Sequence, residues 1–177
     1  MKTLETERLI LRKWTVEDLD DFYEYAKTPN VGPSAGWKPH ENKEESLKIL
    51  EMFIAKENPL FAIVWKENNK AIGSIELFSD PKRTSIGSYE LGYVLAEPYW
   101  WKGIMVEAGM AVLQYAFEEL NQELVGIGHY PFNQKSKRVI EKLGFQYEGT
   151  LRRAHQLFDG SIQDLLCYSI TKEEFER

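Results

Sequence analysis

The strongest helical pattern in the chain stands between two strand-like segments, and this order restricts the folds available to it. Strand-like runs occupy Ser88–Leu95 and Leu124–Tyr130. Between them, Lys102–Leu120 repeats apolar side chains at the three- and four-residue spacing of a helix face, at Val106, Met110, Leu113, Phe117 and Leu120. A strand–helix–strand unit joins strands that are parallel or separated by a splayed gap. We therefore predict a sheet covered by helices.

The segments outside this unit predict hairpins and shorter helices. Further strands are expected at Arg8–Trp14, Leu60–Trp65, Ala71–Phe78, Gln146–Arg153 and Ile162–Ile170. Further helices are expected at Thr15–Ala26, after Asn42 along a face of Leu47, Leu50, Phe53 and Ile54, and at Asn133–Leu143, where Gly144 supplies a left-handed stop. Pro29–Pro39 is expected to be a loop. This order indicates a mixed sheet of the α+β class.

Length and charge narrow the class of protein further. The 177 residues suit one domain spanning 1–177. A net charge of −6 argues against nucleic-acid binding and mildly favours a cationic partner such as an amine. No apolar run has membrane-spanning length and the start lacks a signal-peptide pattern, so we expect a cytoplasmic protein with no membrane partner. The single cysteine, Cys167, agrees with a reducing compartment and is interpreted as a small buried hydrophobe.

The start of the long helix has features of a phosphate site. The first N–H groups of a helix lack partners within it, and the helix dipole favours an anion there. Gly103 permits close approach of a ligand to the backbone, and Lys102 adds a cation. Many helices begin in this way and bind nothing, so this feature alone does not assign a ligand.

A series of motifs in a fixed order is more specific. They stand at Glu5–Arg12 (ETERLILR), Glu90–Tyr93 (ELGY), Tyr99–Gly103 (YWWKG), Asn133 with Ser136, and Glu141–Phe145 (EKLGF). Over nearly the whole chain, this series resembles the GNAT superfamily of acyl-CoA N-acyltransferases, specifically its RimJ/RimL-like branch. The resemblance implies a mostly antiparallel mixed sheet of about seven strands with about four helices, splayed between strands four and five. It also implies acetyl transfer from acetyl-CoA, as co-substrate, to a primary amine.

The same resemblance implies where acetyl-CoA binds. The pantetheine arm would lie along the backbone of Tyr93, Val94 and Leu95. The diphosphate would meet the helix start, which comprises Lys102, Gly103, Ile104, Met105 and Val106. Asn133 and Ser136 would contact the coenzyme from the next helix. Trp101 stands where glycine is common, and a positive φ there would strain a tryptophan; we hypothesise that its indole stacks on a ligand ring.

Candidate catalytic groups follow from the chemistry. An amine must lose a proton before attack, the tetrahedral oxyanion needs a donor, and the thiolate needs an acid. We expect Glu90 to be the base, directly or through water, and the Leu95 N–H to be the oxyanion donor. Ile140 occupies the position where many superfamily members have an acidic tyrosine, so Ser136 is the expected acid.

Each of these roles has an alternative. Glu90 can instead belong to an ion pair, and Ser136 can bond to its own helix or contact the coenzyme only. His40, His129 and His155 are alternative bases, and their scatter along the chain gives no metal-ligand spacing, so no metal is expected.

Four residues are expected to bind the acceptor: Trp37, His40, Tyr99 and Trp100, with Phe132 as a further candidate. The loop Pro29–Pro39 would then set acceptor identity, and core or loop anchoring is the alternative for each aromatic side chain. The acceptor can be a protein amino terminus or a small amine, and the competing function is a non-catalytic acyl-CoA binding or sensing module. A homodimer is plausible. A dinucleotide enzyme is excluded because no G-x-G-x-x-G follows a strand.

Overall fold

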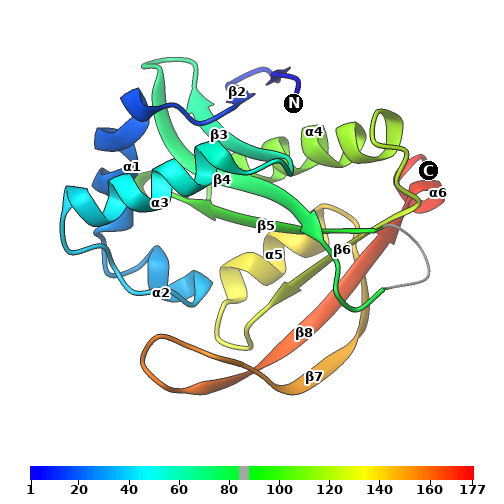
Figure 1. The fold of residues 1–177 in the computed structure, drawn as a ribbon. Coiled ribbons are helices and arrows are strands. Elements are labelled where there is room, and N and C mark those ends of the chain that lie inside the picture. Colours follow the sequence, from blue (N-terminus) through cyan, green and yellow to red (C-terminus); the bar gives the residue numbers. More distant parts are fainter. Residues whose placement is uncertain (84–87) are drawn as a thin grey trace. The chain divides into compact units, whose positions relative to one another are not determined.

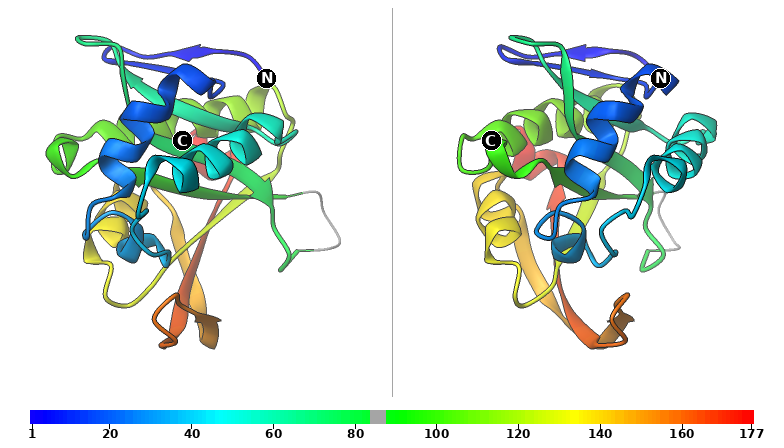
Figure 2. Two further views of the ribbon diagram at one scale, coloured as in Figure 1. Left: turned by 60° about the vertical axis from the view of Figure 1, so that its left-hand side comes forward. Right: turned by 90° about the vertical axis from the view of Figure 1, so that its left-hand side faces the viewer.

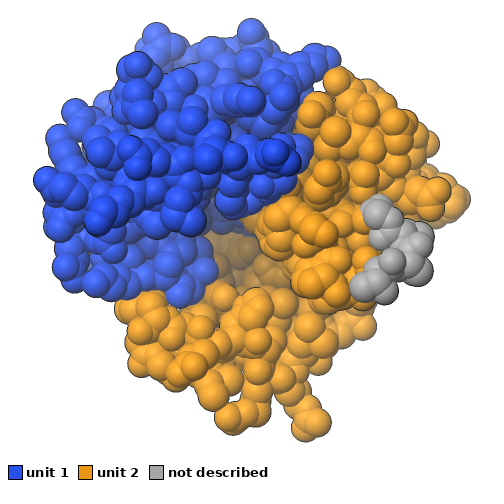
Figure 3. Space-filling view, in the orientation of Figure 1, with its two compact units in different colours: residues 1–76, 93–111 blue, residues 77–92, 112–177 orange. Residues whose placement is uncertain are grey.

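The computed structural model describes residues 1–83 and 88–177 (Figure 1). The chain divides into two compact units, each described by itself. Unit 1 comprises Met1–Glu76 and Tyr93–Ala111, and unit 2 comprises Leu77–Gly92 and Val112–Arg177 (Figure 3). One domain over 1–177 stays a prediction.

Each unit contributes strands and helices to the fold. Unit 1 contains β1 (Leu4–Glu5), β2 (Leu9–Arg12), the 3₁₀ helix η1 (Val16–Asp18), α1 (Leu19–Ala26), α2 (Gly32–Ala35), α3 (Lys43–Ala55), β3 (Leu60–Trp65) and the 3₁₀ helix η2 (Glu97–Tyr99). Unit 2 contains β6 (Leu124–His129), α5 (Gln134–Lys142), β7 (Gln146–Gln156), β8 (Ile162–Thr171) and α6 (Lys172–Phe175). Three elements contribute residues to both units: β4 (Lys70–Ser79), β5 (Tyr89–Leu95) and α4 (Ile104–Glu118).

The sheet confirms the predicted mixed, mostly antiparallel topology. Its strand order is β1-β2-β3-β4-β5-β6-β8-β7. Strands β2 and β3 pair antiparallel, as do β6 with β8 and β7 with β8, whereas β5 and β6 are parallel. The described β5–β6 pairs run from Tyr89↔Val125 to Leu91↔Ile127, although β5 continues to Leu95 and β6 to His129. This short parallel ladder is what the strand–helix–strand pattern predicts.

The core of each unit is formed by apolar side chains that alternate along strands or recur along one face of a helix. In unit 1, Leu9 and Leu11 of β2 are fully buried together with Phe61 and Ile63 of β3, as the two-residue period of a strand requires. Trp14 packs on Phe22 and Phe53, with ring centroids 5.5 and 6.0 Å away. Figure 2 shows α1 and α3, which carry these two phenylalanines, side by side.

The core of unit 2 forms under the second half of α4. Leu113 and Phe117 on that helix are buried, and Phe117 packs on Phe175 of α6 with ring centroids 5.2 Å apart. Ile140 of α5 is fully buried and Cys167 of β8 is 6% exposed, so the interpretation of this cysteine as a buried hydrophobe agrees with its position.

The structure corrects several details of the predicted elements. Strand β1 and helices α2 and α6 were not predicted, and α2 lies inside the expected loop. Pro33 stands in its first turn and Gly36 closes it at φ 94°, so residues that suggested a loop are helix boundaries. Met110 and Ile54, expected on buried faces, are 43% and 40% exposed. The described helices include none with the length and apolar character needed to cross a membrane.

Candidate active site

The end of β5 presents backbone groups along one edge. The Ala96 N–H donates to the Ile72 carbonyl at 2.7 Å, and the Val94 carbonyl oxygen lies 2.4 Å from where a Cβ on Gly73 would stand. Val94 and Ala96 therefore direct their backbone toward β4. Because successive residues of a strand direct their hydrogen-bonding groups to opposite edges, those of Tyr93 and Leu95 point away from β4. An extended ligand chain can pair with such an edge.

Trp100 holds the segment that follows β5 against the end of that strand. Its indole N–H donates a hydrogen bond of 2.7 Å to the carbonyl of Leu95, and η2 lies between the two residues. The side chain was predicted to contact the acceptor. The indole N–H has its partner in the backbone of the strand, which gives Trp100 a role in setting the path from β5 to α4, and its contact with the acceptor stays a prediction.

A turn with two left-handed residues leads into α4. Trp101 has φ 65° and Gly103 has φ 74°. The Glu107 N–H donates to the Gly103 carbonyl at 3.0 Å, so the N–H groups of Ile104, Met105 and Val106 precede the first closed turn of the helix. Trp101 thus has the positive φ that would strain a tryptophan, and its side chain is 69% exposed.

Lys102, in the middle of this turn, and Tyr99, shortly before it, have partners within unit 1. The ammonium of Lys102 lies over the ring of Tyr99, 5.5 Å from its centroid. Tyr99 also contacts Trp65, at 5.7 Å between ring centroids, and accepts a hydrogen bond of 3.4 Å from Asn68. Tyr99 thus packs on the β3–β4 hairpin.

Sequence reasoning missed a cluster formed by Thr6, Arg8 and Glu107. The carboxylate of Glu107, in the first turn of α4, accepts hydrogen bonds from the Thr6 hydroxyl at 2.5 Å, the Arg8 backbone N–H at 2.9 Å and Arg8 Nε at 2.6 Å. Arg8 Nη1 also donates to the carbonyl of Lys102 at 3.0 Å. The motif ETERLILR was the available signal, but a salt bridge across 99 positions cannot be read from local spacing.

Two predicted acceptor residues, Trp37 and His40, lie together. Their ring centroids are 5.2 Å apart, and His40 Nδ1 lies 2.7 Å from the hydroxyl of Ser46 on α3. Burial lowers the pKa of His40, so the imidazole is favoured in its neutral form.

A further contact connects the segment before α2 with η2. The carboxamide of Asn30 donates to the Glu97 carboxylate at 2.9 and 3.1 Å.

In unit 2, Glu90 is buried and paired. It is 7% exposed, and its carboxylate accepts a hydrogen bond of 2.5 Å from the ammonium of Lys82. Lys82 also lies 3.4 Å from Asp80, which pairs with Arg83. Burial opposes the charge on Lys82, but Glu90 and Asp80 outweigh it and raise the pKa of that ammonium. The ion-pair alternative for Glu90 is thus present in the structure, and its role as base stays a prediction.

The two predicted coenzyme contacts on α5 are one turn apart. The carboxamide oxygen of Asn133 accepts a hydrogen bond of 3.1 Å from the Ser136 N–H, which makes Asn133 the N-cap of α5. Ser136 is half-buried in this first turn. Asn133 therefore caps α5. The contacts of Asn133 and Ser136 with the coenzyme stay predictions.

The alternative histidine bases in unit 2 have partners of their own. His129 Nδ1 lies 2.8 Å from the Tyr130 carbonyl and its Nε2 lies 3.1 Å from the Tyr168 hydroxyl. His155 Nδ1 lies 3.2 Å from the Tyr130 hydroxyl. Phe132 is 50% exposed and stacks on Tyr130 at 5.5 Å. His129 thus pairs with Tyr168 of β8, whereas His155 of β7 and Phe132 both contact Tyr130, which follows β6.

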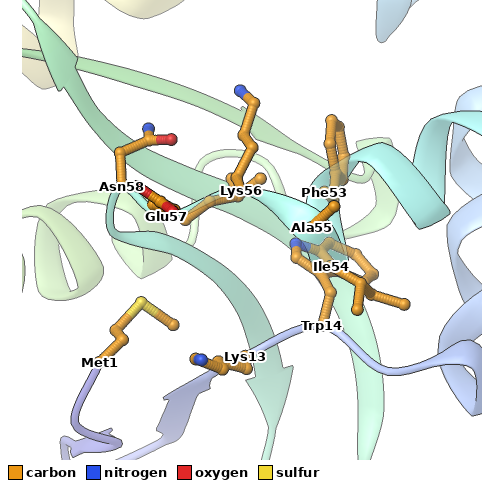
Figure 4. Close-up of a pocket in the computed structure, with 10 residues that line it drawn as sticks. Met1, Lys13, Trp14, Phe53, Ile54, Ala55, Lys56, Glu57 and Asn58 are labelled. Carbon is orange, nitrogen blue, oxygen red and sulfur yellow. The ribbon is translucent and has the colours of Figure 1, made fainter.

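A pocket of about 280 Å³ lies elsewhere in unit 1 (Figure 4). The pocket is lined by Met1, by the two residues after β2, by the C-terminal end of α3, by the segment after it and by the first residue of β3, and no predicted site residue is among them. The indole of Trp14 is one wall, and Lys13 lies beside it.

Comparisons with known proteins agree with the motif series and the fold. A family model described as "Acetyltransferase (GNAT) domain" matches residues 8–146. The uncharacterized N-acetyltransferase p20 of Bacillus licheniformis is 30% identical over 99% of both chains. The ribosomal protein uS5-alanine N-acetyltransferase of Escherichia coli is 24% identical, over 97% of this chain and 92% of its own.

A solved structure gives the same result for the fold. The GNAT-family acetyltransferase from Bacillus anthracis is 25% identical and superposes with a TM-score of 0.86, covering 98% of this chain and 100% of its own. The chain belongs to the GNAT acetyltransferases and transfers an acetyl group from acetyl-CoA to an amine.

Proposed function

We propose that this enzyme acetylates primary amines in a ternary complex, with protein amino termini as its first candidate acceptor and small amines as the second. The observation that carries the proposal is the turn at Trp101–Gly103, which precedes the start of α4 and follows the end of β5 through η2. The proposal for protein termini is supported by the similarity to the enzyme named for the alanine of ribosomal protein uS5.

The proposed coenzyme site uses the backbone of unit 1. Tyr93 and Leu95 would pair with the pantetheine arm, whose amides match a strand edge, and Val94, whose backbone faces β4, would lie along the same stretch without pairing. The N–H groups of Gly103, Ile104, Met105 and Val106 would hold the diphosphate, because a helix start concentrates unpaired donors and a positive dipole end. Lys102 would add its charge, and Trp101 would stack on the coenzyme. Acetyl-CoA supplies the activated acyl group.

Three groups would carry the proton and charge transfers. Glu90 would take the proton of the acceptor ammonium, directly or through water. The Leu95 N–H would stabilise the oxyanion, and Ser136 would protonate the departing thiolate. A terminal α-amine has a reference pKa of about 7.7–8.0, against about 10.4 for lysine, so less is required of the base when the acceptor is a protein terminus.

The acceptor is identified by thiol release from acetyl-CoA. The panel contains peptides that begin with alanine or serine, the same peptides with blocked termini, polyamines and amino sugars. We expect turnover with free-terminus peptides and none with their blocked forms. Turnover confined to polyamines or amino sugars would reject the protein acceptor. Coenzyme binding without turnover on any amine would favour the sensing module.

A further inference from the structure

Arg8 joins the amino-terminal part of the chain to the turn that precedes α4. Its guanidinium donates to the carbonyl of Lys102 at 3.0 Å and to Glu107 at 2.6 Å, so one side chain contacts the turn and the helix that follows it. Nη2 is also the nearest atom to the position that a Cβ on Gly103 would occupy, at 3.8 Å. The side chain is only 36% exposed, because it packs over the ring of Trp65.

The contact with Lys102 matters because of the conformation of its neighbours. Trp101 and Gly103, on either side of Lys102, both have positive φ. A left-handed conformation is strained for a non-glycine residue such as Trp101 and persists only when the surroundings impose it. Arg8 holds the peptide carbonyl between the two left-handed residues, and so holds the direction of the N–H groups that follow.

Glu107 gives a second, electrostatic argument. A carboxylate in the first turn of α4 stands close to where a diphosphate would bind, and an unpaired negative charge there would repel it. Both of its oxygens are engaged by Thr6 and Arg8. Burial opposes ionisation of this group, but the hydrogen bonds from Thr6 and Arg8 prevail and lower the pKa of Glu107. The carboxylate is therefore charged, and Arg8 supplies the compensating cation.

We propose that Arg8 is a positioning residue for coenzyme binding, which fixes the turn Trp101–Gly103 and neutralises Glu107 so that the start of α4 accepts the diphosphate of acetyl-CoA. This inference rests on the diphosphate site under the proposed function. It assigns no contact between Arg8 and the acyl group, so its effect is confined to the diphosphate end of the coenzyme.

The test compares two ligands that differ in the diphosphate. The affinity for coenzyme A is measured by calorimetry, and that for S-acetylpantetheine, which lacks the diphosphate and nucleotide, by displacement titration. We expect Arg8→Gln to weaken coenzyme A about tenfold, the loss of one charge-assisted hydrogen bond, and to leave S-acetylpantetheine within about twofold. Arg8→Lys, which keeps the charge without the fork, should lose nearly as much.

Arg12→Gln is the matched control. Arg12 lies on the same strand and pairs with Asp18 at 2.7 and 2.8 Å, within its own hairpin and helix region. This variant should lose stability without losing coenzyme A affinity. If Arg8→Gln does not fold, as judged by circular dichroism, Arg8→Lys provides the same comparison.

The outcomes separate the two proposals. Equal weakening of both ligands by Arg8→Gln, or full coenzyme A affinity in Arg8→Lys, would overturn the positioning role. If the unmodified enzyme binds coenzyme A no better than S-acetylpantetheine, the diphosphate site itself fails, and the proposed function must be revised instead.

Discussion

The indole N–H of Trp100, just after η2, donates a 2.7 Å hydrogen bond to the carbonyl oxygen of Leu95, the last residue of β5. This bond holds the segment that connects the strand proposed to bind pantetheine with the turn proposed to bind the diphosphate. Trp100, which was predicted to contact the acceptor, therefore has a structural role beside the proposed coenzyme site.

We expect Trp100→Phe to raise the KM for acetyl-CoA several-fold and to lower the free energy of unfolding by about 0.5–1.5 kcal/mol, the usual net value of one hydrogen bond. Steady-state kinetics and urea denaturation measure the two effects. Trp65→Phe is the control, because it removes an exposed indole bond to Glu67. Equal KM values for Trp100→Phe and the wild type would show that the link is unimportant for binding.

Replacing Trp101 tests both its strain and its stacking. Trp101→Gly relieves a left-handed tryptophan but adds freedom to the unfolded chain, and these effects of about 1–2 and 0.5–1 kcal/mol leave a small net stabilisation. If the indole stacks on the coenzyme, affinity for acetyl-CoA should fall several-fold. Trp101→Asn is the matched variant, since asparagine tolerates positive φ. A large gain in affinity in either variant would exclude stacking.

The catalytic role of Glu90 can be separated from its ion pair with Lys82. Glu90→Gln keeps an oxygen that can accept from Lys82 but removes the basic carboxylate. We expect kcat to fall about 10²-fold, the lower range for loss of a general base. Glu148→Gln is the control, because Glu148 also pairs with a cation, Arg83, in unit 2. A wild-type kcat for Glu90→Gln would leave Glu90 as a structural residue only.

Asp18 makes stability depend on acid pH. It is 5% exposed. Burial opposes its charge, but hydrogen bonds from Arg12 and the Thr15 N–H prevail and lower its pKa. A carboxyl with a depressed folded pKa stabilises the fold above its unfolded pKa of about 3.9, and this stabilisation is lost as pH falls through the folded value.

The wild type and Asp18→Asn are compared by their free energies of unfolding over a range of pH that includes the unfolded pKa of Asp18. We expect the wild type to exceed Asp18→Asn in unfolding free energy at neutral pH, and the difference to shrink below about pH 4. Urea denaturation at a series of pH values measures it. Asp20→Asn, which removes an exposed partner of Lys43, should change little; a pH-independent difference for Asp18→Asn would contradict the linkage.

Local patterns predicted most of the elements. The apolar period found α4, with observed bounds of Ile104–Glu118, and the left-handed stop of α5 at Gly144 has φ 85°. The capping pair of Thr15 and Asp18 is observed at η1, where the Thr15 N–H donates to Asp18 at 2.9 Å. Each of these features is decided within four residues of chain, the range over which sequence spacing carries information.

Burial on the helices was less predictable. Ser46 is fully buried on α3 while Ile54 is exposed, because Ser46 has His40 as a partner and Ile54 lies near the end of the helix. A buried hydroxyl is acceptable only when a partner is present. The partner lies outside the helix, so helical spacing alone could not predict this face.

The sequence by itself determined most of the strands and helices in their order, the position of Trp101 where glycine is common, and the family. Only the tertiary structure paired Arg8 with Glu107, turned the Trp100 indole onto Leu95, and placed Lys82 against Glu90. The first group depends on backbone preferences and on neighbours three or four residues away. The second joins charges and donors from distant segments, and their pairing is fixed only when burial makes an unpaired polar group costly.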